Sequence, residues 1–220
     1  MDGLKKSVGA ALIVGVHHEE LPFGRAAVLA LGETGSIPDL KVIEIAQGLA
    51  RPQSFRNRKF FYNTYHNELY LQIHRQLKKK YGLVMDLHVG HIEEGLAAEI
   101  YTRNRRLLSA IDRVNSDSSR LDLYFIAGRN EYTENTEELN ICHTIIPECV
   151  WRSDSYVYAG IEIFVESRDG FSGFRKDEID FAVEIIRLVW KGFNSIQRQT
   201  EKNRQPVIGA GKTGSKTEPG

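Results

Sequence analysis

A continuous apolar run near the start of the chain places the strongest constraint on its fold. Residues 8–16 (VGAALIVGV) contain no polar side chain. A strand that is apolar on both faces must be covered on both faces, which is typical of a parallel strand inside a sheet that lies between helices. The run is too short to cross a bilayer as a helix. It therefore favours a buried strand of an α/β protein.

Further strand and helix patterns alternate along the sequence. Residues 62–81 have apolar side chains at helical spacing, and Gly82 stands at the end of this helix. Alternating strands and helices predict an α/β fold, a three-layer sandwich with a mainly parallel (mixed) central sheet. We expect strands at 8–16, 39–45, 83–88, 96–102, 121–128 and 156–167, and helices at 62–81, 105–114 and from Asp177 to about 198.

Length and charge narrow the classes of protein and partner. We expect one domain over residues 1–198 and a disordered tail over 199–220, where the chain is polar and rich in glycine and lysine. Lys plus Arg and Asp plus Glu number 29 each. Because the net charge is zero, we predict no nucleic-acid partner and no membrane partner, while a homo-oligomer stays open.

Cysteine usage and the first residues bear on the compartment. Cys142 and Cys149 are too few for a disulfide framework, so we expect them to be reduced, in the cytoplasm. Lys5 and Lys6 before the apolar run imitate a secretory signal. The run ends in charged residues without a cleavage site of small residues, so we expect it to be a strand of the mature protein.

Polar side chains follow three of the predicted strands. Residues 17–20 (HHEE) come directly after the first strand, Asp86 and His88 end another, and Glu162 and Glu166 lie on a late strand. In α/β sheets, ligand sites lie beyond the carboxyl ends of the strands. We therefore expect these side chains to lie close to one another.

The first two groups have the residue types and spacing of a metal site. His17 and Glu20 can face one ion from a tight turn, and His88 would complete three protein ligands. Three ligands with an open position for water are typical of catalytic zinc. His18 replaces His17 if the turn is shifted by one residue. Asp86 shares a side of its strand with His88 and could hold that imidazole from behind, or could be a turn or cap carboxylate.

These segments resemble a known group of zinc hydrolases. His-x-x-Glu, a strand that ends in Asp-x-His and a late strand with a glutamate resemble the zinc carboxypeptidase fold and its relatives aspartoacylase, succinylglutamate desuccinylase and the N-formylglutamate amidohydrolases. Residues 62–88 are similar to the last of these, with a Tyr-His pair that opens a long helix leading into Asp-x-His. The resemblance implies a fold of the zinc-carboxypeptidase (phosphorylase/hydrolase-like) type with one Zn²⁺.

The resemblance also implies which residues bind the substrate. The family has an Asn-Arg pair between its two ligand segments that binds a substrate carboxylate, and Asn57 and Arg58 match this pair. An earlier arginine, matched by Arg51, polarises the scissile carbonyl. The planar guanidinium suits a carboxylate because it donates two parallel hydrogen bonds. Without the resemblance, these residues are typical of a solvated basic loop.

The late strand is expected to supply the general base. Glu162 and Glu166 face the same side, and we choose Glu166 because it stands at the carboxyl end of the strand. Glu162 is the reserve candidate, since it lies deeper and would need a partner to stay charged. His91 is a further reserve for the pocket, although a loop role is favoured.

Together these features predict a zinc-dependent hydrolase that cleaves an amide bond in a small, carboxylate-bearing substrate, either an N-acyl amino acid or a peptide end. Two alternatives stay open. One is a non-catalytic small-molecule-binding protein that keeps the fold without the metal. The other is a metal-free hydrolase that uses a histidine and a carboxylate as acid and base.

Overall fold

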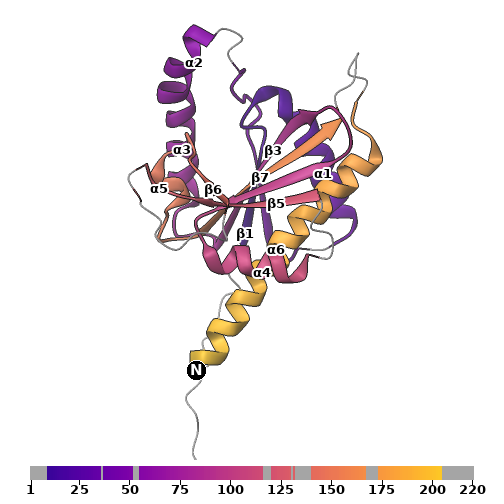
Figure 1. The fold of residues 1–220 in the computed structure, drawn as a ribbon, viewed down its shortest axis with the longest axis vertical. Helices are drawn as coiled ribbons and strands as arrows, with labels where there is room; N and C mark the ends of the chain where they lie inside the picture. The colour runs from indigo at the N-terminus through magenta and orange to yellow at the C-terminus, as the bar shows by residue number, and fades with distance from the viewer. Residues whose placement is uncertain are drawn as a thin grey trace, which may run out of the picture.

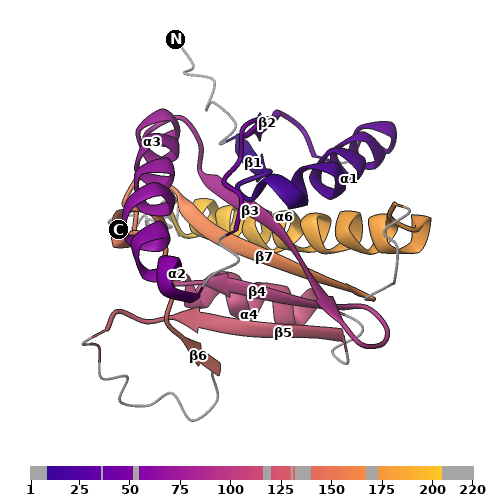
Figure 2. The ribbon, with the colours of Figure 1, turned by 90° about the horizontal axis from the view of Figure 1, so that it is seen from above.

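Helices cover both faces of one seven-stranded sheet in the computed structural model (Figures 1 and 2). The model describes residues 9–35, 37–51, 55–115, 120–129, 131, 140–166 and 173–204. Its strands are β1 (Ala10–Val14), β2 (Leu40–Glu44), β3 (Leu83–Ile92), β4 (Ala97–Thr102), β5 (Leu121–Ile126), β6 (Asn140–Cys142) and β7 (Val157–Glu166). Its helices are α1 (Leu21–Glu33), α2 (Phe55–Phe61), α3 (Asn67–Leu77), α4 (Arg105–Val114), α5 (Glu148–Trp151) and α6 (Lys176–Arg204), with a 3₁₀ turn at His18–Glu20 and a π-helical turn at Tyr62–His66.

The sheet is mixed and mainly parallel, as the sequence predicts. Its strand order is β2-β1-β3-β7-β4-β5-β6. Strands β2, β1, β3 and β7 run parallel to one another, β4 is antiparallel to β7, and β5 and β6 run parallel to β4. The carboxyl ends of β1 and β3 therefore point the same way, and residues 17–20 follow β1 at that end.

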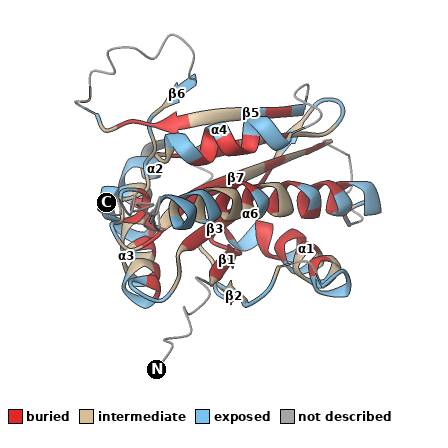
Figure 3. Ribbon diagram, turned by 90° about the horizontal axis from the view of Figure 1, so that it is seen from below, coloured by how far each residue is buried: buried red, intermediate tan, exposed pale blue. Residues whose placement is uncertain are grey.

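The two faces of the sheet carry separate hydrophobic cores. Leu12 and Val14 of β1 pack in the core that includes α1, α4 and α6, whereas Ala11 and Ile13 pack in the core that includes α3 and α5. All five residues of β1 are buried, and buried residues lie where helices face the sheet (Figure 3). The prediction that this strand is covered on both faces is confirmed.

Some element boundaries differ from those predicted. Helix α1 is not among the helices expected from the sequence, and α6 continues to Arg204, beyond the expected boundary at 198. No glycine or proline occurs between Arg198 and Arg204 to end that helix, and the first proline after it is Pro206. The rest of the expected tail, 205–220, lies outside the described residues. Among the helices that are described, none is long and apolar enough to span a membrane.

Candidate metal centre

A close approach of two backbone segments fixes the turn after β1. Gly15 has a φ of +81°, a conformation that other residues rarely adopt. The chain after β2 passes so close that a Cβ added at Gly48 would lie 2.1 Å from the carbonyl oxygen of Gly15. The amide of His18 donates to the carbonyl of Leu49 at 3.1 Å, and the amide of Glu20 donates to the carbonyl of His17 at 3.0 Å. These contacts hold residues 17–20 in a tight turn at the end of β1.

This turn and β3 bring the three predicted ligands together. Nδ1 of His17 lies 3.0 Å from Oε1 of Glu20, and Nδ1 of His88 lies 2.9 Å from Oε2 of the same carboxylate. The possible ligand atoms of the three residues all lie within 4.8 Å of one another, and all three side chains are buried. His18 is exposed, so the turn presents His17.

A buried carboxylate holds the ring of His88 from behind. Oδ2 of Asp86 lies 3.3 Å from Nε2 of His88 and accepts hydrogen bonds from the hydroxyls of Tyr70 at 2.6 Å and Tyr158 at 2.9 Å. Because Asp86 occupies Nε2, Nδ1 of His88 is the nitrogen that faces Glu20. Carboxylates in this position orient metal-binding histidines and increase their basicity.

The two buried carboxylates remain negatively charged. Burial raises the pKa of Glu20, but hydrogen bonds from His17 and His88 outweigh burial and lower this pKa to about 2. Burial likewise acts to raise the pKa of Asp86. The charge of His88 and the hydrogen bonds that Asp86 accepts from His88, Tyr70 and Tyr158 lower that pKa below its ordinary value. Burial lowers the pKa of His88, while Asp86 and Glu20 together raise it well above its ordinary value. The cluster thus stabilises positive charge between its carboxylates.

His66 is a member of the site to which the sequence assigned no role. It is buried at the π-helical turn before α3, and its ring stacks on that of His17 with centroids 5.8 Å apart. Burial and the charge of His17 lower the pKa of His66 to about 4, so its imidazole is neutral. The extra residue of a π-turn shifts the helical register, and such turns are frequent at functional sites.

The residues of the cluster fit a zinc ion. Two imidazole nitrogens and one carboxylate are a ligand set of catalytic zinc, which keeps a further position for water or substrate. Nε2 of His17 and Nδ1 of His66 are buried without a hydrogen-bond partner among the described residues. A buried polar atom without a partner calls for an ion, a water molecule or a ligand.

A cavity of about 310 Å³ opens beside the cluster. One part of its lining is polar and includes Arg51, Tyr101 and Glu162, and another part is apolar and includes Ile126, Ile145 and Ile146. The remaining lining residues are His17, His66, Tyr70, His88, Cys142, His143, Thr144, Tyr158, Gly160 and Ile161. The proposed ligands therefore face a space large enough for a small molecule.

The structure places Glu162 at this cavity, whereas Glu166, the predicted general base, is not among the residues that line it. Glu162 pairs in register with His88, and its Oε1 lies 3.1 Å from where a Cβ on Gly90 would be. Burial raises the pKa of Glu162 to about 7. Glu166 does not line the cavity and accepts a hydrogen bond from Arg175 at 2.9 Å. Strands β3 and β7 extend beyond the end of β1, so the last residue of β7 lies past the site.

The other predicted site residues differ in their positions. Arg51 stands at the cavity, where its guanidinium donates to Glu20 and lies 3.3 Å from Nδ1 of His17. Arg58 is exposed on α2 and does not line this cavity, and the side chain of Asn57 lies outside the described part of the structure. His91 is exposed, and it stands three residues after His88 on the same strand. Its side chain therefore points to the other face of β3. The carboxylate-binding role of the Asn-Arg pair stays a prediction.

No protein-family model and no curated protein matches the sequence. A single-residue variant of murine aminoacylase 3 has a TM-score of 0.46 and 14% identity over 88% of this chain, and the chain covers 65% of that structure. A bacteriophage poly-gamma-glutamate hydrolase has a TM-score of 0.45 and 11% identity over 88% of this chain and 86% of its own. The CwlD amidase from Clostridioides difficile has a TM-score of 0.43 and 11% identity over 89% of this chain and 100% of its own.

These three structures are named as an aminoacylase, an amidase and a poly-gamma-glutamate hydrolase. The TM-scores are below 0.5, and the chain spans less than two thirds of the aminoacylase 3 variant. The roles of individual residues therefore depend on the geometry of this site alone, and no single family is assigned to the chain.

Proposed function

We propose that this chain is a zinc-dependent hydrolase that cleaves an amide bond in a carboxylate-bearing substrate, an N-acyl amino acid or a peptide end. The convergence of His17, Glu20 and His88 beside a cavity carries the proposal. Asp86 supports the proposal because its carboxylate contacts Nε2 of His88 and so directs Nδ1 towards Glu20. An ion pair with only a structural role does not need its imidazole held in one orientation.

The residues around the ligands divide the chemical work. Zn²⁺ at this site would supply a Lewis acid that lowers the pKa of a water molecule toward about 7. Glu162 is the residue to take a proton from the attacking water and return it to the leaving amine, because its carboxyl lies at the cavity on the strand next to His88. This role passes to Glu162 from Glu166, which lies outside the cavity.

Arg51 and the cavity walls suit a substrate with one anionic and one apolar part. Among the described residues that line the cavity, Arg51 is the one guanidinium, and it can polarise the scissile carbonyl or bind a carboxylate. It would exchange its present bond with Glu20 for one with the substrate. Ile126, Ile145 and Ile146 can contact an apolar acyl group or side chain. Asn57 and Arg58 remain the proposed residues that bind the substrate carboxylate.

Metal content tests the proposal most directly. Elemental analysis should find about one zinc ion per purified chain, as expected for a three-ligand catalytic site. His88→Ala should lose the ion. His91→Ala is the matched control, because it removes an imidazole from the same strand but from the opposite face, and it should retain zinc. If the wild-type protein contains no zinc and its melting temperature does not rise when zinc is added, the proposal is contradicted. The alternative of a non-catalytic small-molecule-binding protein is then favoured.

Turnover then separates the roles of the two glutamates. With a panel of N-acyl amino acids, Glu162→Gln should retain zinc and lose about 10²- to 10⁴-fold in kcat, the usual contribution of a general acid–base residue. Glu166→Gln should keep the wild-type kcat. The reverse order would place the base at the end of β7 and contradict the assignment of Glu162.

A further inference from the structure

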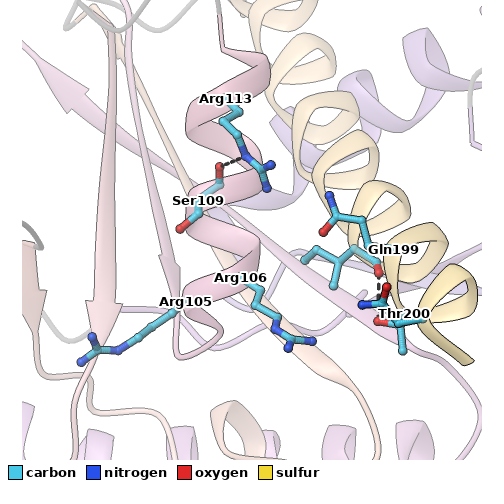
Figure 4. Close-up of a pocket in the computed structure, with 8 residues that line it drawn as sticks. Arg105, Arg106, Ser109, Arg113, Gln199 and Thr200 are labelled. Atoms are coloured by element: carbon cyan, nitrogen blue, oxygen red, sulfur yellow. Dashed lines mark hydrogen bonds between the residues drawn. The ribbon is translucent and has the colours of Figure 1, made fainter.

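A second hollow, of about 490 Å³, lies between α4 and α6 (Figure 4). These helices cover the face of the sheet opposite α3, so the hollow is on the other side of the sheet from the metal cluster. Its lining consists of Arg105, Arg106, Ser109, Arg113, Ile196, Gln199, Thr200 and Asn203. None of these eight residues is acidic, although the chain as a whole has no net charge.

The hollow is built from one polar side of each helix. Arg106, Ser109 and Arg113 are spaced by three and four residues, so they lie on one side of α4. Across from them, Gln199 and Thr200 belong to α6 (Figure 4). Figure 4 shows Arg106 and Arg113 on the side of α4 that faces α6.

Arg105 belongs to a different environment. In Figure 4 its side chain turns away from α6, and its guanidinium carbon lies 4.8 Å from the centroid of the Phe125 ring. This cation–π contact gives Arg105 a structural partner. Arg106 and Arg113 are therefore the two cations that the hollow offers to a ligand.

The positive charge of Arg106 has no visible compensation. It stands in the first turn of α4, beside the positive end of the helix dipole, and that turn contains no acidic residue. Arg106 forms no ion pair with any residue that the structure describes. Nε of Arg113 donates to the carbonyl of Ser109 at 3.0 Å, which leaves its two terminal nitrogens outside that bond.

We propose that this hollow binds a phosphate group, carried either by a small metabolite or by a lipid headgroup. A phosphate monoester bears a charge of about −1.5 to −2 and three acceptor oxygens, which matches two guanidinium groups. The side chains of Ser109, Gln199 and Asn203 can supply further donors. The volume leaves room for the part of the ligand that carries the phosphate.

Calorimetric titration of the full chain tests this site. The probes are inorganic pyrophosphate and vesicles of phosphatidylcholine with and without phosphatidic acid. We expect saturable binding at one site that Arg106→Gln/Arg113→Gln weakens by about tenfold or more, because each charge-assisted hydrogen bond contributes about that factor. Binding of pyrophosphate indicates a soluble ligand, and binding of only the phosphatidic acid vesicles indicates a headgroup.

Two control variants make the result specific. Arg75→Gln makes the same type of substitution at one exposed arginine on α3 and should leave binding unchanged. His88→Ala removes a proposed metal ligand and should also leave binding unchanged. This control shows whether the phosphate probe binds at the metal centre instead of in the hollow. Absence of saturable binding to both probes, or an equal loss in Arg75→Gln or in His88→Ala, would overturn the proposal.

Discussion

Replacement of Glu162 by glutamine should change how the stability of the metal-free protein depends on pH. Burial raises the pKa of this carboxyl from 4.5 to about 7. A group whose pKa is higher in the folded state binds its proton more tightly there than in the unfolded chain. Its contribution to stability is therefore fully present below about pH 4.5 and is lost as the pH rises through about 7. Glutamine cannot titrate, so Glu162→Gln should lack this loss.

The size of the effect follows from the two pKa values. One pKa unit corresponds to about 1.4 kcal/mol, so a rise from 4.5 to about 7 corresponds to about 3 kcal/mol in total. Part of this is already lost at pH 5, and between about pH 5 and pH 8 we expect a loss of about 2.5 kcal/mol. Urea denaturation in the presence of a chelator should show that the free energy of unfolding of wild type falls by about this amount relative to Glu162→Gln.

Glu166→Gln provides the control. It makes the same chemical change on the same face of the same strand, but at an exposed ion pair with Arg175. Exposed pairs contribute about 0 to 1 kcal/mol, so the pH dependence should match that of wild type within about that range. His88 titrates in all three proteins, so the difference between the curves is the quantity to compare. Parallel curves for wild type and Glu162→Gln would refute the claim that partial burial beside the metal cluster raises the pKa of Glu162.

Two further changes test the supports of the site. Asp86→Asn should weaken zinc binding by about 10- to 100-fold, measured by competition with a chromophoric chelator, because the amide no longer holds His88 with a charged oxygen; unchanged affinity would show that this carboxylate does not orient the imidazole. Gly48→Ala should lower the midpoint of urea unfolding and reduce zinc content together, because its Cβ would lie 2.1 Å from the carbonyl oxygen of Gly15; wild-type values for both would mean that the turn can move without cost.

The ligand cluster could be predicted because it depends on local order and strand direction. The apolar run of β1 indicated a parallel strand, and the ends of parallel strands meet at one edge of a sheet. This rule was sufficient to place His17 and Glu20 near His88. The period of two along a strand was sufficient to place Asp86 on the same side as His88. Both inferences use the spacing of residues in the sequence and the direction of parallel strands.

The choice of base and the role of His66 depend on quantities that sequence spacing does not contain. Glu166 would lie level with the site if all parallel strands ended at one level, but β1 ends at Val14 while β3 and β7 run on past it. The relative lengths of neighbouring strands follow from tertiary packing. His66 turns inward at a π-turn, which adds one residue to a helix that otherwise follows the usual period.

The arrangement of β3 separates the chemistry of the site from the stability of the fold. Asp86 and His88 alternate with Leu87 and Val89, which lie in the core shared with α1, α4 and α6. The polar residues of β3 that form hydrogen bonds with one another thus lie on the α3 face. The apolar residues of the same strand pack in the core on the opposite face. A conservative change among the polar residues removes hydrogen bonds from the site and leaves the larger core intact. Variants of the ligands, and of residues such as Asp86 that orient them, should therefore lose the metal before they lose the fold. Metal content and proton uptake are thus more informative measurements on these variants than the melting temperature.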